Sequence, residues 1–261
     1  MARIAVAATA PLGADVLERL ARTHEVVLLL TRPDKPRGRG RMLQPTPAKE
    51  VAERRGIPVA QPAKLDESVE IPAETVVVCA YGLLIPESLL QRGLWLNVHP
   101  SLLPRWRGAA PVERALMAGD ERTGVTIHET VKELDAGPIA AQEPFDLTED
   151  DDAGSVFARS AEIAARLLND VIAAPHFEPQ PEAGATYAEK ITPEDRELDP
   201  SRPARENVNV VRALSPHIGA RLGDLLVWKA RVAGDGSFEP VEVQPAGGRR
   251  MDYDAYLRGR R

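Results

Sequence analysis

Two polar side chains that could take part in catalysis lie close together in the segment 96–111, LNVHPSLLPRWRGAAP. Asn97 and His99 stand two positions apart at the end of an apolar run. A strand over this run would project both side chains from the same face. Asp135 follows Asn97 by 38 positions, in the glycine-containing segment LDAGPI. The three residues therefore form a candidate catalytic set.

An amide, an imidazole and a carboxylate are the groups needed to transfer an acyl group to an amine. The Asn97 amide could donate a hydrogen bond to a developing oxyanion. The His99 imidazole could move protons near neutral pH, and Asp135 could orient it and favour its cation. None of the three need be a covalent nucleophile. From the pattern alone, the same residues could instead satisfy loop backbone groups, with LDAG as a plain turn.

Apolar runs and helical periodicity alternate along the first part of the chain. Strands are predicted over residues 3–8, 26–30, 58–61, 75–81 and 94–98, and helices near 16–21 and over 47–55, 86–91, 111–118 and 152–173. Residues 125–131 alternate like a half-exposed strand, with 138–145 as a hairpin partner, while 32–45 is predicted as a loop. This order predicts an α/β fold with an open, doubly wound, mainly parallel sheet, which binds ligands beyond the carboxyl ends of its strands.

The periodicity stops at residues 174–185, a segment with three prolines that predicts a linker. A short helix is predicted over 203–214, with strands over 224–232 and 238–243. We therefore expect a catalytic domain over 1–174, a linker over 175–200 and a small β-rich domain over 201–261. At about 60 residues the last is near the minimum for a self-sufficient core.

The charge distribution and several absent motifs exclude other classes of protein. The net charge of −6 argues against general coating of nucleic acid, but residues 32–41 carry five bases and one acid, which suits a local phosphate contact. The chain has no Walker, GxGxxG or GxSxG pattern in the required context, and its five histidines lack metal-site spacing. Cys79 is the single cysteine, and no apolar run could cross a bilayer. These features predict a cytoplasmic protein without a metal.

The segments NVHPSLLPRWRGAAP and LDAGPI resemble the formyltransferases that use 10-formyltetrahydrofolate. The basic segment 31–62 narrows this resemblance to the methionyl-tRNA formyltransferases. Further similarity to that family lies in RWRGAAPVERALMAGDERTGVTI (105–127), ATYAEKITPED (185–195), VWKA (227–230) and VQPAGGRRMDYDAYLRGRR (243–261). The resemblance thus runs nearly end to end, and implies a Rossmann-like formyltransferase fold followed by a reduced domain of oligonucleotide-binding type.

The resemblance assigns roles to individual residues. It implies that Asn97, His99 and Asp135 are the catalytic residues that transfer the formyl group of 10-formyltetrahydrofolate to the amino group of methionyl initiator tRNA, for translation initiation. The implied folate site comprises Ser101, Leu102, Leu103 and Pro104, together with Tyr81, Gly82, Leu83, Leu84 and Val131. The implied tRNA-binding loop carries Lys35, Arg37, Arg39 and Arg41. No metal and no membrane are implied, and we expect a monomer.

The chain also departs from the family pattern. Pro100 stands where a small residue is usual, and AATAPLGADVL differs from the usual GTPxFA stretch near the N-terminus. Only twelve residues, 231–242, separate VWKA from VQPAGG, so the C-terminal barrel is expected to be reduced. Two alternatives stay open: an amino-sugar nucleotide formyltransferase, which the basic loop argues against, and a folate- or tRNA-binding module without turnover, which the intact set of Asn97, His99 and Asp135 argues against.

Overall fold

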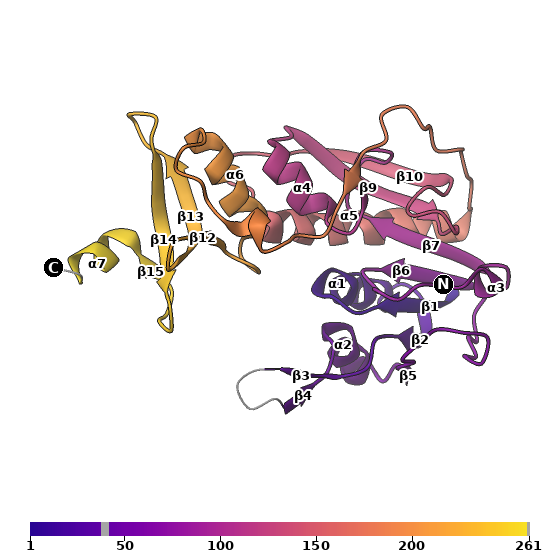
Figure 1. The fold of residues 1–261 in the computed structure, drawn as a ribbon. Coiled ribbons are helices and arrows are strands. Elements are labelled where there is room, and N and C mark those ends of the chain that lie inside the picture. The colour runs from indigo at the N-terminus through magenta and orange to yellow at the C-terminus, as the bar shows by residue number, and fades with distance from the viewer. Residues whose placement is uncertain (38–41, 260–261) are drawn as a thin grey trace. The chain divides into compact units, whose positions relative to one another are not determined.

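A computed structural model describes residues 1–37 and 42–259 of the chain (Figure 1). The chain forms two compact units, and each is assembled from three separate segments. The first unit comprises Met1–Arg107, Gly124–Pro144 and Ala158–Ala185, and the second comprises Gly108–Thr123, Phe145–Phe157 and Thr186–Arg261. The division into catalytic domain, linker and C-terminal domain expected from the sequence remains a prediction.

The first unit is built on a seven-stranded sheet with the order β10-β9-β7-β6-β1-β2-β5. Its strands are β1 (Arg3–Ala8), β2 (Glu25–Leu30), β5 (Val59–Ala60), β6 (Thr75–Cys79), β7 (Leu94–His99), β9 (Arg122–Glu129) and β10 (Ile139–Asp146). Pairing is parallel from β5 to β7 and becomes antiparallel between β7 and β9. The predicted open, mainly parallel α/β sheet is confirmed.

The predicted helices of this unit are present, with small changes at their ends. They are α1 (Pro11–Leu20), α2 (Pro47–Arg55), α3 (Glu87–Leu90) and, continuing from the second unit, α5 (Ala153–Ala173). The Thr46 hydroxyl accepts a hydrogen bond from the Lys49 amide at the start of α2, with Pro47 in the first helical position. In α1, a Cβ at Gly13 would lie 2.4 Å from the Cys79 carbonyl oxygen, so glycine lets this helix approach the sheet closely.

Two local predictions were wrong. Part of the expected loop 32–45 is a hairpin, in which β3 (Lys35–Arg37) pairs with β4 (Met42–Gln44). Strand β9, expected to be half exposed, has six buried residues out of eight. Its polar side chains are covered because they bond neighbouring segments: the Thr126 hydroxyl donates to the Ser101 carbonyl, and the ring of His128 contacts Asn97.

The second unit contains two helices and a small antiparallel sheet. Its helices α4 (Pro111–Ala118) and α6 (Ala204–Leu214) share an apolar core with the start of α5. The sheet has the order β12 (Ala220–Leu222), β13 (Leu225–Val232), β14 (Phe238–Pro245) and β15 (Met251–Asp252), followed by α7 (Tyr253–Arg258). Because β12 and β15 stand at opposite edges, the sheet is open, as expected for a reduced barrel.

Several short elements complete the fold. Strand β8 (Arg107–Gly108) pairs with β11 (Tyr187–Ala188), and a 3-10 helix, η1, spans Glu194–Arg196. The expected linker 174–185 is not a free connection, because Glu178 forms a β-bridge with Ile139. No helix in the described residues is long and apolar enough to span a membrane.

Candidate active site

Strand β7 presents the first two predicted catalytic residues. Asn97 lies opposite His128 of β9, and His99 lies opposite Thr126, in an antiparallel register. The two positions are separated by one residue, so both side chains leave the same face of the sheet. Their neighbours on the strand, Leu96 and Val98, are buried in the core. The strand therefore fixes the amide and the imidazole next to each other.

The loop after β9 brings Asp135 to the same place. Its carboxylate lies with Oδ1 3.2 Å from the Asn97 amide nitrogen and Oδ2 3.7 Å from His99 Nδ1. Gly137 closes the loop against β9, where a Cβ would lie only 1.8 Å from the Glu129 carbonyl oxygen. The structure thus brings together all three residues of the predicted catalytic set.

The two ring nitrogens of His99 face different groups. Nε2 lies 2.7 Å from the Trp106 carbonyl oxygen, which can only accept, so Nε2 carries a hydrogen and donates it. Nδ1, the other ring nitrogen, faces the Asp135 carboxylate. His99 is only 3% exposed, and this burial lowers its pKa, while the Asp135 carboxylate opposes the change. The free protein therefore favours a neutral imidazole with its lone pair on Nδ1.

His128 is a buried part of the site that the sequence analysis missed. Its Nε2 is 3.0 Å from the Asn97 amide nitrogen, and its Nδ1 is 2.8 Å from the Glu129 carbonyl oxygen. Since a carbonyl only accepts, Nδ1 donates to it and Nε2 accepts from Asn97 in the neutral ring. Both hydrogens of the Asn97 amide are then held, one by His128 and one by Asp135. No local pattern in the sequence marks this residue, since its contact with Asn97 depends on the alignment of β7 with β9.

Backbone strain marks the same region. In the described part of the chain, three non-glycine residues have a left-handed backbone: Ala80, Trp106 and Asp135, with φ of 49°, 65° and 48°. Asp135 is a catalytic candidate, Trp106 holds His99, and Ala80 precedes the segment Tyr81–Leu84. Such conformations cost of order 1–3 kcal/mol each and gather at functional sites.

The SLLP segment, predicted to contact folate, forms a tightly bonded turn beside the catalytic set. Ser101 is fully buried, and its hydroxyl donates to the Arg105 carbonyl oxygen. Leu103 is buried too, and its amide donates to the Thr126 hydroxyl. Leu102 and Pro104 are partly exposed. A ligand here would contact the backbone and the side chains of Leu102 and Pro104, because Ser101 and Leu103 face the interior.

The other predicted folate residues differ in exposure. The Tyr81 side chain lies in the apolar core with Leu83 packed against that core, and burial raises the pKa of Tyr81 to about 12. Gly82 has a left-handed backbone, and Val131 is partly exposed. Leu84 is 86% exposed, which leaves its side chain free to cover an apolar ligand. Their role in folate binding remains a prediction.

The predicted tRNA-binding residues fall only partly within the described chain. Lys35 is exposed on β3, and Arg37 ends that strand, while Arg39 and Arg41 lie outside the described residues. The base of the hairpin is anchored by Asp34, whose carboxylate accepts from the Lys49 ammonium at 2.6 Å and from the Gln61 amide at 2.7 Å. This contact with Lys49 lowers the pKa of Asp34.

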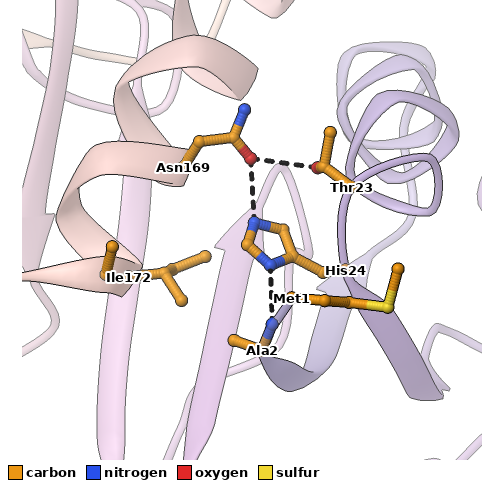
Figure 2. A pocket seen from close by; sticks show the side chains of 7 residues that line it. Met1, Ala2, Thr23, His24, Asn169 and Ile172 are labelled. Carbon is orange, nitrogen blue, oxygen red and sulfur yellow. Dashed lines mark hydrogen bonds between the residues drawn. The ribbon is translucent and has the colours of Figure 1, made fainter.

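A separate hollow near the N-terminus has no residue in common with the predicted sets. Its volume is about 460 Å³, and Figure 2 shows its lining side chains. There His24 accepts from the Ala2 amide and bonds the Asn169 side-chain oxygen at 2.8 Å, which ties the start of the chain to α5.

Across the described residues, no group of three or more His, Cys, Asp or Glu side chains could hold a metal ion.

Comparison with known proteins identifies the family. Residues 2–172 match the formyl transferase family model. The whole chain is 40% identical to the methionyl-tRNA formyltransferase of Halorhodospira halophila, of which it covers 97%, and 98% of it is 36% identical to that of Dechloromonas aromatica, of which it covers 95%. The chain belongs to the methionyl-tRNA formyltransferase family. The resemblance noted from its motifs is thereby confirmed, and the protein is an enzyme.

Solved structures of the superfamily share the fold. A methionyl-tRNA formyltransferase from Clostridium thermocellum superposes with a TM-score of 0.66 at 16% identity, covering 97% of this chain and 100% of that one. An N-formyltransferase from Helicobacter canadensis, solved with folinic acid and dTDP-3-aminofucose, gives a TM-score of 0.69 at 16% identity, covering 89% and 88%. At these identities the likeness is one of fold.

Proposed function

We propose that this enzyme transfers the formyl group of 10-formyltetrahydrofolate to the amino group of methionyl initiator tRNA in the cytoplasm. One observation carries the proposal. This chain is similar to a methionyl-tRNA formyltransferase over its whole length, and its Asp135 carboxylate lies beside both the Asn97 amide and Nδ1 of His99. These are the groups that formyl transfer to an amine requires, and the reaction needs no metal.

His99 moves the proton in this mechanism. The methionyl nitrogen forms a bond to the formyl carbon, and the carbonyl electron pair moves onto oxygen. The proton lost by the amine goes to Nδ1 of His99, because Nε2 is held by the Trp106 carbonyl. The imidazolium then lies beside the Asp135 carboxylate, which stabilises it. The oxyanion then returns its electron pair to re-form the carbonyl as the bond between carbon and the folate nitrogen breaks. That nitrogen keeps the electron pair of the broken bond and takes the proton from His99.

Asn97 stabilises the oxyanion of the tetrahedral intermediate. Its amide hydrogens are held by His128 and Asp135 in the free enzyme, so one must turn from its present acceptor to the oxyanion. Removing a single oxyanion donor typically costs about 100- to 1,000-fold in turnover. Asn97→Ala is therefore expected to lower kcat by this factor.

A formyl-transfer assay tests the proposal. Methionyl initiator tRNA, free methionine and an amino-sugar nucleotide serve as parallel acceptors with 10-formyltetrahydrofolate. We expect formyl-methionyl-tRNA as the main product, and loss of most turnover in His99→Ala. Transfer to the sugar nucleotide alone would overturn the proposal. That alternative has weaker support, since the structures of similar fold that are named for a sugar substrate are 15–22% identical to this chain.

Binding of the tRNA acceptor stem is assigned to Lys35, Arg37, Arg39 and Arg41. Each cation that contacts a phosphate contributes roughly one unit to the slope of log affinity against log salt. Arg39→Ala and Arg41→Ala should therefore raise KM for tRNA and flatten its salt dependence, with kcat little changed. Arg3→Ala, a change on an exposed arginine of β1, is the matched control. An unchanged salt slope in both loop variants would contradict the assignment.

A further inference from the structure

The segment after α5, whose composition predicts a linker, runs back along the catalytic loop. Glu178 exchanges two backbone hydrogen bonds with Ile139, at 2.8 and 2.9 Å. Two positions further on, the side-chain amide nitrogen of Gln180 donates to the carbonyl oxygens of Asp135 and Gly137, each at 3.0 Å. One side chain thus holds the backbone on both sides of Ala136, next to the catalytic carboxylate.

Buried Arg107 fixes the orientation of the Gln180 amide. Arg107 is only 3% exposed, and its Nε donates to Gln180 Oε1 at 2.7 Å. A guanidinium can only donate, and the two carbonyls can only accept. The amide oxygen must therefore face Arg107 and the amide nitrogen must face the loop, which leaves a single arrangement for the side chain.

The loop needs such support because Asp135 has a left-handed backbone, with φ of 48°. This conformation is unfavourable for a residue with a Cβ and persists where the surroundings impose it. The carbonyls that Gln180 holds belong to Asp135 itself and to Gly137. A change at residue 180 would let the loop relax and would move the carboxylate away from His99.

We propose that Gln180 is a positioning residue that, oriented by Arg107, holds the catalytic loop so that Asp135 faces His99 and Asn97. The proposal rests on the proposed function for its kinetic consequences. Gln180 touches none of the reacting atoms, so its effect passes through the position of the Asp135 carboxylate. Residues that support the ligands of metal sites typically contribute about 10- to 100-fold to activity, and we expect an effect of similar size for Gln180.

Two variants at residue 180 separate the contacts. Gln180→Ala removes all of them, while Gln180→Glu keeps an acceptor for Arg107 but places oxygen against the two loop carbonyls. We expect kcat to fall about 10- to 100-fold in both variants, with KM for folate and tRNA within about twofold. Glu182→Gln is the matched control, because Glu182 lies in the same segment, contacts Arg107 at 3.4 Å and has a side chain that is 81% exposed. It should retain wild-type kcat.

An NMR titration of the His99 ring tests the position of Asp135 without substrate. The Asp135 carboxylate raises the His99 pKa against the effect of burial. We therefore expect this pKa to be lower in Gln180→Ala and Gln180→Glu than in the wild type, and unchanged in Glu182→Gln. Wild-type kcat and an unchanged His99 pKa in both Gln180 variants would overturn the proposal, as would a KM effect for tRNA at constant kcat. If the wild type transfers no formyl group, the proposed function fails, while the titration still decides the role of Gln180.

Discussion

His99 has different partners at its two ring nitrogens, and this sets its chemistry. The hydrogen on Nε2 is committed to the carbonyl of Trp106, a residue whose own backbone is left-handed. Nδ1 faces Asp135 at 3.7 Å and is the nitrogen that takes the proton in the proposed mechanism. Burial lowers the His99 pKa and so favours an unprotonated Nδ1, which suits the proton acceptor of the proposed mechanism.

Asp135→Asn is the cleanest test of this pair. Asparagine tolerates a left-handed backbone, so the change removes charge while keeping the loop. Loss of the carboxylate removes the effect that raises the His99 pKa, so that pKa should fall further below its ordinary value of 6.5. NMR titration should show this decrease, and kcat should drop about 100- to 10,000-fold. A His99 pKa equal to that of the wild type, with near-normal turnover, would contradict the assignment.

His128 should matter for both stability and turnover. His128→Phe leaves an Asn97 amide hydrogen without its acceptor, which typically costs about 1–3 kcal/mol. We expect a decrease of that size in the free energy of unfolding, measured with urea, together with reduced kcat. His128→Gln supplies a new acceptor and should recover part of both losses. Equal behaviour of the two variants would show that the hydrogen bond to Asn97 is unimportant.

The proposed catalytic and positioning residues differed in how far the sequence could predict them. Asn97 and His99 are adjacent on one strand face, so their spacing sufficed. Asp135 was a candidate from its residue type and its glycine-containing segment, and the family resemblance then assigned it a role; a loop position gives no periodicity that would place it beside Asn97. His128 and Gln180 were missed because their partners are chosen by tertiary structure: 31 positions separate His128 from Asn97, and 45 separate Gln180 from Asp135.

Among the elements, the hairpin of β3 and β4 is the least apparent from the sequence. Its proline, glycine and arginine content is typical of a loop, and its strands are only three residues long. The cluster of Asp34, Lys49 and Gln61 at its base supplies the order that local propensity lacks. The bounds of helix α2, in contrast, were predicted correctly, because Thr46 and Pro47 are a local signal for the start of a helix.

In the second unit, a partly exposed ion pair joins η1 to α4. Asp195 accepts two hydrogen bonds of 2.8 Å from Arg114, and this contact lowers its pKa from 3.8 to about 2. The lowered pKa contributes about 2 kcal/mol of stability above pH 4, and the contribution is lost as the pH falls toward 2. Urea denaturation of Asp195→Asn should therefore show a deficit of about this size at pH 7 that shrinks between pH 4 and pH 2.

A double-mutant cycle checks the source of this stability. Arg114→Gln should lower the unfolding free energy by a similar amount. The double variant should lose much less than the sum of the two single losses, because each single change already removes the ion pair between Arg114 and Asp195. Additive losses would mean that Asp195 is stabilised by other groups, such as the Thr192 amide that also donates to it.

For the whole molecule, the division into two units does not follow the order of the chain. Each unit takes three separate segments, so the segment 108–123 contributes α4 to the unit that also holds the C-terminal sheet. Composition could indicate a break near residue 174, but it could not show that α4 packs with α6. Contacts between distant segments decide this, and no local pattern encodes them.

Cutting the chain at the expected linker should therefore damage both parts. Val112 and Leu116 of α4 share a core with Ala213 of α6, and both are almost fully buried. A fragment of residues 1–185 would expose them, at a cost of about 3 kcal/mol or more. We expect increased binding of an apolar dye and a lower urea midpoint than in the full chain. A fragment as stable as the full chain would contradict this.

The pairing of β7 with β9 also limits how the enzyme can change in length. Asn97 opposite His128 and His99 opposite Thr126 depend on one alignment of the two strands. Inserting or deleting one residue in β7 would turn the proposed catalytic side chains of Asn97 and His99 to the opposite face of the sheet, and the same change in β9 would turn His128 away from Asn97. Evolution and protein engineering can therefore exchange residues within these two strands, but they cannot add or remove one without losing the arrangement of Asn97, His99 and His128.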